Sequence, residues 1–139
     1  MEINSEKDEK YMRLAIEEAK FALEADEVPI GAIIVAEGRI VGRGHNLVET
    51  LTDVTAHAEL QAITAAASTI GGKYLNDCTL YVTVEPCPMC AGALAWSRVI
   101  TGAVVGFSIV PGILELEYLL VFLVRHQALV KFIIQKLDP

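Results

Sequence analysis

Two short clusters of metal-binding residues constrain this chain more than any other feature. The first is His57-Ala58-Glu59, and the second is Pro86-Cys87-Pro88-Met89-Cys90. One imidazole and two thiolates are three ligands of the kind that Zn²⁺ takes, and three protein ligands leave the fourth tetrahedral position open for a water. The fold must therefore bring His57, Cys87 and Cys90 together, and the open position predicts a catalytic zinc.

Other uses of these residue types have to be weighed. A Cys-x-x-Cys pair alone is typical of a redox pair or of half a structural zinc site, but a second such pair is absent from the sequence. Cys78 is either a fourth, structural ligand or a small buried hydrophobe, and its place at a strand start favours the core. We expect His45 and His126 to be solvated or hydrogen-bonded rather than to be ligands.

Hydrophobic periodicity and turn residues predict a mixed sheet flanked by helices. The expected helices cover about 5–25, 56–68 and 87–96, and the expected strands cover 31–36, 39–44, 79–84 and 99–107. Residues 45–55 are predicted to be a polar loop, and Trp96 is predicted to pack within its helix. The apolar stretch 113–137 is expected to form one or two buried helices, interrupted near Arg125-His126-Gln127.

This order of elements predicts where the two clusters meet. Strand–loop–helix units place the starts of the second and third helices at one edge of the sheet, where α/β sites usually lie. A helix N-terminus favours negative charge, which helps to hold Cys87 as a thiolate. Glu59 is a carboxylate two residues from the His57 ligand, so it can move protons for a zinc-bound water. Asn46, after the second strand, is either a turn residue or a hydrogen-bond partner of a substrate.

Composition limits the class of protein. The length of 139 residues predicts one domain over 1–139, and 53% hydrophobic residues can fill its core. The formal net charge of −7 argues against unaided binding to long polynucleotides, although a local basic patch is compatible with it. The polar N-terminus lacks a signal peptide, and the run Tyr118–Val124 is far shorter than the ~20 residues of a membrane span. We therefore expect a cytoplasmic, reduced protein without a membrane segment.

The two clusters also match a known pattern. His-x-Glu followed by Pro-Cys-x-x-Cys is the signature of zinc nucleobase deaminases. The flanking residues resemble bacterial tRNA adenosine deaminases, and the resemblance covers about residues 8–98. It is carried by Glu27–Ala32, Gly44-His45-Asn46, Thr55–Glu59, Leu80–Cys87 and Met89–Ala93.

The resemblance implies a fold, a partner and an activity. The fold is a cytidine-deaminase-like three-layer α/β/α arrangement with a mixed sheet, usually in a homodimer. The activity is the hydrolytic deamination of adenosine to inosine at the wobble position of a tRNA anticodon, so the partner is the anticodon loop.

The same resemblance implies roles for six residues. One Zn²⁺ per subunit binds His57, Cys87 and Cys90, and Glu59 is the catalytic proton shuttle. Asn46 contacts the target nucleotide, and the backbone of Ala58 binds the base.

The C-terminal part departs from this family. We expect the resemblance to end at about Ile100, and after Gly106-Phe107 the expected acidic residue is replaced by Ser108–Pro111, which makes 108–139 atypical. A shifted reading frame or a rearranged end would give this pattern.

Two alternatives follow for the function. Glu85–Cys90 and Trp96-Ser97-Arg98 also resemble guanine deaminases, so the substrate can be a free base (guanine or cytosine) or a nucleoside. The second alternative is a catalytically impaired zinc-binding module, because the altered C-terminus can disable turnover. The intact Glu59 argues against this one, since a purely structural zinc does not need it.

Overall fold

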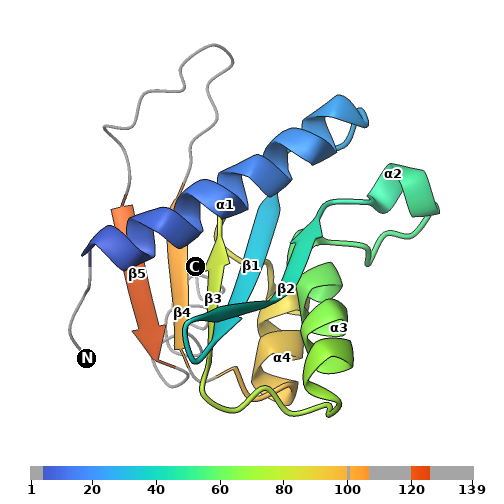
Figure 1. Ribbon diagram of the computed structural model, residues 1–139. Helices are drawn as coiled ribbons and strands as arrows, with labels where there is room; N and C mark the ends of the chain where they lie inside the picture. The colour runs from blue at the N-terminus through green and yellow to red at the C-terminus, as the bar shows by residue number, and fades with distance from the viewer. Residues whose placement is uncertain (1–4, 100, 107–119, 126–139) are drawn as a thin grey trace, which may run out of the picture.

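The computed structural model describes residues 5–99, 101–106 and 120–125, which form one mixed sheet with helices on both faces (Figure 1). The helices are α1 (Ser5–Glu24), α2 (Val48–Leu51), α3 (Ala58–Ile70) and α4 (Pro88–Trp96). The strands are β1 (Gly31–Ala36), β2 (Arg39–His45), β3 (Cys78–Val82), β4 (Thr101–Gly106) and β5 (Leu120–Arg125). Their order in the sheet is β2-β1-β3-β4-β5.

Strand directions follow from the connections. A tight turn joins β1 to β2, and both of its central residues have positive φ, 51° at Glu37 and 74° at Gly38. Such a turn matches the twist of an antiparallel hairpin. β1 also pairs antiparallel with β3. β3 and β4 are parallel because α4 returns the chain to the same end of the sheet.

Each face of the sheet has its own core, which confirms the three-layer α/β/α prediction. α1 covers one face, and α3 and α4 lie together on the other (Figure 1). On the α1 face Met12, Ile33 and Tyr81 are buried together. On the α3–α4 face the buried cluster includes Leu80 and Leu94.

Two glycines let β2 lie against α3 at close range. A Cβ added at Gly42 would lie 2.4 Å from the Ala62 carbonyl oxygen, and one at Gly44 would lie 2.4 Å from that of Ala58. No side chain fits at these distances, so both residues must be glycine for the helix to seat this deeply. The Gly44 contact fixes the first turn of α3, where the first cluster lies.

The structure differs from the sequence-based predictions in two segments. The expected polar loop 45–55 contains the short helix α2. The expectation of buried helices over 113–137 is wrong for 120–125, which form β5 antiparallel to β4. The rest of that stretch lies outside the described residues, and a single domain over 1–139 stays a prediction. Among the described residues, no helix combines the length and apolarity needed to span a membrane.

Candidate metal centre

The three predicted zinc ligands lie at the starts of two neighbouring helices. His57 is the N-cap residue of α3 and Cys87 that of α4, and both have extended backbone angles. Pro88 occupies the first turn of α4, where its missing N–H costs nothing and its fixed φ suits the helix. Cys90 lies one turn further, on the face that packs against the core, and is fully buried.

The side chains of these residues converge on one point. The Nδ1 atom of His57 lies 3.6 Å from the Sγ of Cys87 and 3.5 Å from the Sγ of Cys90. All three ligand atoms lie within 4.8 Å of one another. Tetrahedral zinc, with Zn–N near 2.0–2.1 Å and Zn–S near 2.3 Å, separates a nitrogen from a sulfur ligand by about 3.5 Å. The group can therefore hold a metal ion, and its spacing fits zinc.

Electrostatics also point to a cation at this position. Burial raises the pKa of the Cys90 thiol above its ordinary value of 9.0, and the neighbouring Glu59 and Cys87 raise it further. Glu59 is itself only 4% exposed and hydrogen-bonds to the Cys90 side chain. Several groups that become anionic are thus crowded into a buried space. A bound divalent cation removes this conflict, because a coordinating thiol is deprotonated outright.

Thr83 ties the sheet to the second cluster, a role that sequence reasoning missed. Its Oγ1 accepts a hydrogen bond of 3.1 Å from the Gly31 N–H, and its own N–H donates to the Gly31 carbonyl oxygen over 3.1 Å. Thr83 is buried and lies between β3 and Cys87. The available signal was a polar residue inside the apolar run Leu80–Val84.

Asn46 and Ala58 are the two residues for which a substrate contact is predicted. Asn46 follows β2 and is buried, and its Oδ1 accepts a hydrogen bond of 3.2 Å from the N–H of Val48. The turn interpretation of Asn46 therefore has a structural basis. Ala58 is the buried first residue of α3, so its N–H is one of the first-turn donors that lack an intrahelical acceptor.

The remaining candidates have other roles. Cys78 is buried at the start of β3 and is not in the metal-binding group, which confirms the core interpretation. His45 pairs with Glu18, Nδ1 to Oε2 2.9 Å, as expected of a hydrogen-bonded histidine. The prediction for Trp96 is wrong, because its side chain is 84% exposed. His126 lies outside the described residues.

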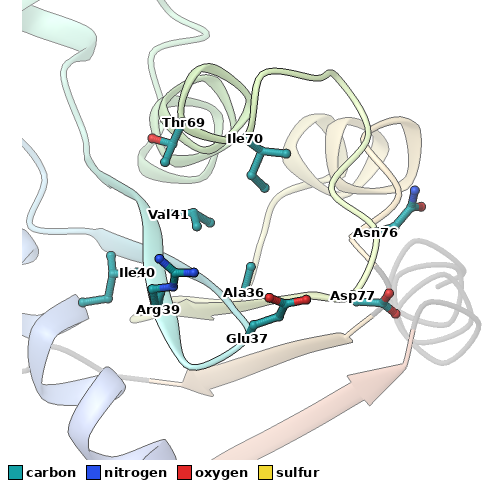
Figure 2. A pocket seen from close by; sticks show the side chains of 9 residues that line it. All are labelled: Ala36, Glu37, Arg39, Ile40, Val41, Thr69, Ile70, Asn76 and Asp77. Atoms are coloured by element: carbon teal, nitrogen blue, oxygen red, sulfur yellow. The ribbon is translucent and has the colours of Figure 1, made fainter.

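A cavity of about 470 Å³ lies away from the metal centre, at the β1–β2 turn. Figure 2 shows Glu37 and Arg39 on one side of it and Thr69 and Ile70, from the end of α3, on the other. Among the described residues, those that line it include neither a histidine nor a cysteine. Because the first turns of α3 and α4 carry the metal-binding group, this cavity is not the candidate site.

The fold and the donor set define a class of three-layer α/β/α proteins with a His-Cys-Cys metal site at two helix N-termini. The chain belongs to the cytidine and deoxycytidylate deaminase family, whose zinc-binding region matches residues 5–107. The tRNA-specific adenosine deaminase of Aquifex aeolicus (strain VF5) is 54% identical over 91 residues, which cover 66% of this chain. They cover 60% of that protein, so the chain spans less than two thirds of this relative's length.

Solved structures agree with the family assignment. One, from a study of A-to-I editing by tRNA:A34 deaminases, is 44% identical with a TM-score of 0.68, and the match covers 70% of each chain. The guanine deaminase from Bacillus subtilis is also 44% identical, with a TM-score of 0.63, over 65% of this chain and 58% of that one. Two substrate classes thus occur among similar structures.

Proposed function

We propose that this protein is a zinc-dependent hydrolytic deaminase that converts adenosine to inosine at the wobble position of tRNA. The observation that carries this proposal is the convergence of His57, Cys87 and Cys90 at two helix starts, with Glu59 against Cys90. The reaction consumes water and releases ammonia as the exocyclic amine of adenine is replaced by oxygen.

The proposed cofactor is one Zn²⁺ per subunit, held by His57, Cys87 and Cys90. When bound, zinc supplies Lewis-acid chemistry that lowers the pKa of water to about 7. The chain's own contribution is to fix the three ligands on two rigid helices. Both cysteines lie at the N-terminal end of α4, where the helix dipole favours negative charge.

Glu59 is the proposed proton shuttle. Its carboxylate accepts one proton of the attacking water and passes it to the ring nitrogen. It then moves the second proton from the added hydroxyl to the exocyclic amine, which leaves as ammonia. Its burial supports this role, because a carboxylate shielded from bulk water exchanges protons with the reacting groups.

Asn46 and the backbone of Ala58 are the proposed substrate contacts. The Asn46 Oδ1 serves the N–H of Val48, which leaves the amide group's N–H donors to bind the target nucleotide. The Ala58 N–H, at the start of α3, is placed to donate to the base.

The relatives support tRNA as the substrate, since the Aquifex aeolicus protein and the A34 deaminase structure both act on tRNA by their names. A free base such as guanine or cytosine, or a nucleoside, is the second candidate. The 44% identity to a guanine deaminase favours it, and so does the net charge of −7.

A homodimer in the cytoplasm is the proposed assembly and location. Apolar side chains of α4 face solvent, with Met89 38% and Trp96 84% exposed. Exposed apolar helix faces of this kind mark protein–protein contacts. A second copy of this chain is the proposed partner on that face.

The test is the inosine content of tRNA that lacks this modification, after incubation with the purified, zinc-loaded protein. We expect inosine from the wild type and at least ~10²-fold less from Glu59→Ala, with zinc content unchanged. Glu24→Ala, at the exposed end of α1, is the matched control and should keep wild-type activity.

Other outcomes select the alternatives. Ammonia released from free guanine, without inosine in tRNA, would establish the second candidate. A folded, zinc-loaded protein without turnover on either substrate would indicate a catalytically impaired zinc-binding module.

A further inference from the structure

Glu27 is a buried carboxylate far in sequence from the residues it binds. It lies between α1 and β1, and it is only 4% exposed. Its Oε1 accepts a hydrogen bond of 2.7 Å from the Glu49 N–H, and its Oε2 lies 3.2 Å from the same nitrogen. The Oε2 also accepts from the N–H and the hydroxyl of Thr50, each over 3.4 Å. One side chain thus binds the first turn of α2.

These contacts replace the cap that α2 lacks. Leu47 is the N-cap residue, and its side chain makes no capping hydrogen bond. The first N–H groups of a helix have no intrahelical acceptor. The Asn46 side chain accepts a hydrogen bond from the N–H of Val48, and the Glu27 carboxylate accepts from those of Glu49 and Thr50. Two side chains therefore bind three consecutive donors.

The arch formed by residues 46–56 depends on these hydrogen bonds. Residues 49–55 are all exposed, and α2 stands clear of the sheet (Figure 1). The arch closes where the Leu47 N–H donates to the Ala56 carbonyl oxygen over 2.9 Å. This hydrogen bond links the residue that follows Asn46 to the residue that precedes His57. α2 buries no residue, so polar contacts hold the arch, and the Asn46 N–H donates to the Ile30 carbonyl oxygen over 3.1 Å.

We propose that Glu27 is a positioning residue, which holds the arch so that the Asn46 carboxamide faces the nucleotide bound at the metal centre. This inference rests on the proposed deaminase function. Because Glu27 accepts from two of the three N–H groups, the Asn46 oxygen accepts only from the third, that of Val48. The Asn46 amide nitrogen has no acceptor within the described part of the chain, and no buried side-chain nitrogen or oxygen there lacks a partner. The amide nitrogen is therefore not fully buried and is free to donate a hydrogen bond.

The charge of Glu27 is part of the argument. A carboxylate offers two acceptor oxygens to the positive end of a helix. In Glu27→Gln one oxygen is replaced by an NH₂ group, which donates and so repels the N–H groups that it faces. Glu27→Ala removes both acceptors. The effect on turnover should therefore increase from Gln to Ala.

The test is a double-mutant cycle in the full-length, zinc-loaded protein, with tRNA as substrate. We expect Glu27→Ala to lower kcat/KM by about 10- to 100-fold, the cost of a misplacement near 1 Å. Zinc content should stay at the wild-type level. In the Asn46→Ala background, Glu27→Ala should lower kcat/KM by less than about twofold, because the residue that it positions is already gone.

Two controls keep the outcome interpretable. Glu18→Ala removes an acidic side chain of similar burial that pairs with His45 instead, and it should leave the coupling between Glu27 and Asn46 intact. Amide hydrogen exchange at Glu49 and Thr50 should accelerate in Glu27→Ala, whatever the substrate.

The positioning role is overturned if the two losses multiply in the double mutant, or if Glu27→Ala keeps wild-type kcat/KM. Failure of the proposed function has a different signature, because the wild type then leaves tRNA unmodified. If the wild type deaminates guanine instead, the same cycle on guanine decides the role of Glu27. A wild type that is inactive on both substrates overturns both proposals.

Discussion

The close contact between β2 and α3 predicts that Gly44→Ala disturbs the metal centre from outside it. The new Cβ would lie 2.4 Å from the Ala58 carbonyl oxygen and 2.6 Å from the Ala62 nitrogen, whereas ordinary contacts begin at 3.4 Å. The first turn of α3 must therefore move by roughly 1 Å, since both obstacles are backbone atoms. This turn begins at His57 and contains Glu59.

The expected magnitudes follow from that displacement. Overpacking of this kind costs about 1–3 kcal/mol of unfolding free energy. Displacing a ligand's supporting structure weakens metal binding by about 10- to 100-fold. Urea unfolding of the metal-free protein measures the first effect, and a competitive zinc titration of the native protein measures the second.

Gly42→Ala is the matched control. Its Cβ would lie 2.4 Å from the Ala62 carbonyl oxygen and 2.8 Å from the Ala66 nitrogen, one turn further from the ligands. We expect a similar loss of stability but nearly normal zinc affinity. Equal losses of zinc affinity in both variants would refute the reasoning, because the effect would then be general destabilisation. Wild-type stability in Gly44→Ala would refute the packing argument itself.

Three further predictions concern single side chains. Cys87→Ala should lose the metal, whereas Cys78→Ala, at the start of β3, should keep it. Metal analysis of both proteins is the test, and full zinc in Cys87→Ala would contradict the proposed ligand set. Tyr81→Phe removes the donor of a 2.6 Å hydrogen bond to the buried Asp8, so urea unfolding should show a loss of about 1–3 kcal/mol. Burial, and next the hydrogen bond to Asp8, raise the pKa of the Tyr81 hydroxyl above its ordinary 10.0. As the pH rises past 10, Tyr81 therefore ionises in the unfolded chain and not in the folded one, so the free energy of unfolding should fall. It should fall less steeply in Tyr81→Phe. Trp96→Glu should give a monomer by sedimentation if α4 is the dimer contact, and an unchanged mass would exclude that face.

Features encoded by neighbouring residues were predictable from the sequence. Proline at the start of α4 and Gly71 at the end of α3 mark helix boundaries by local backbone chemistry. The Glu37-Gly38 turn is local in the same way. The two metal-binding clusters lie at the starts of such helices. Once the sheet and helices were predicted, it could therefore be inferred that the clusters lie close to each other.

Features that depend on distant residues were missed. α2 has four residues and no side-chain cap of its own. The carboxylate that accepts its first N–H groups belongs to Glu27, and both β1 and β2 lie between Glu27 and α2 in the chain. β5 is an apolar run that periodicity cannot distinguish from a buried helix. It is a strand because it pairs with β4, which is distant in the sequence. Trp96 is apolar, but the buried side of α4 is already filled by Cys90, Ala91 and Leu94.

The place of β5 in the sheet separates two questions about this protein. β5 forms the edge beyond β4, whereas the hairpin β1–β2 that supports α3 lies at the opposite edge. The proposed ligands, Glu59 and the supporting residues Thr83 and Gly44 all precede residue 100, within the part that the family region matches. The residues of the candidate metal centre therefore lie outside the unusual sequence after Phe107. Zinc binding and deamination are accordingly separate measurements, and normal zinc affinity without turnover would place the defect outside the metal-binding group.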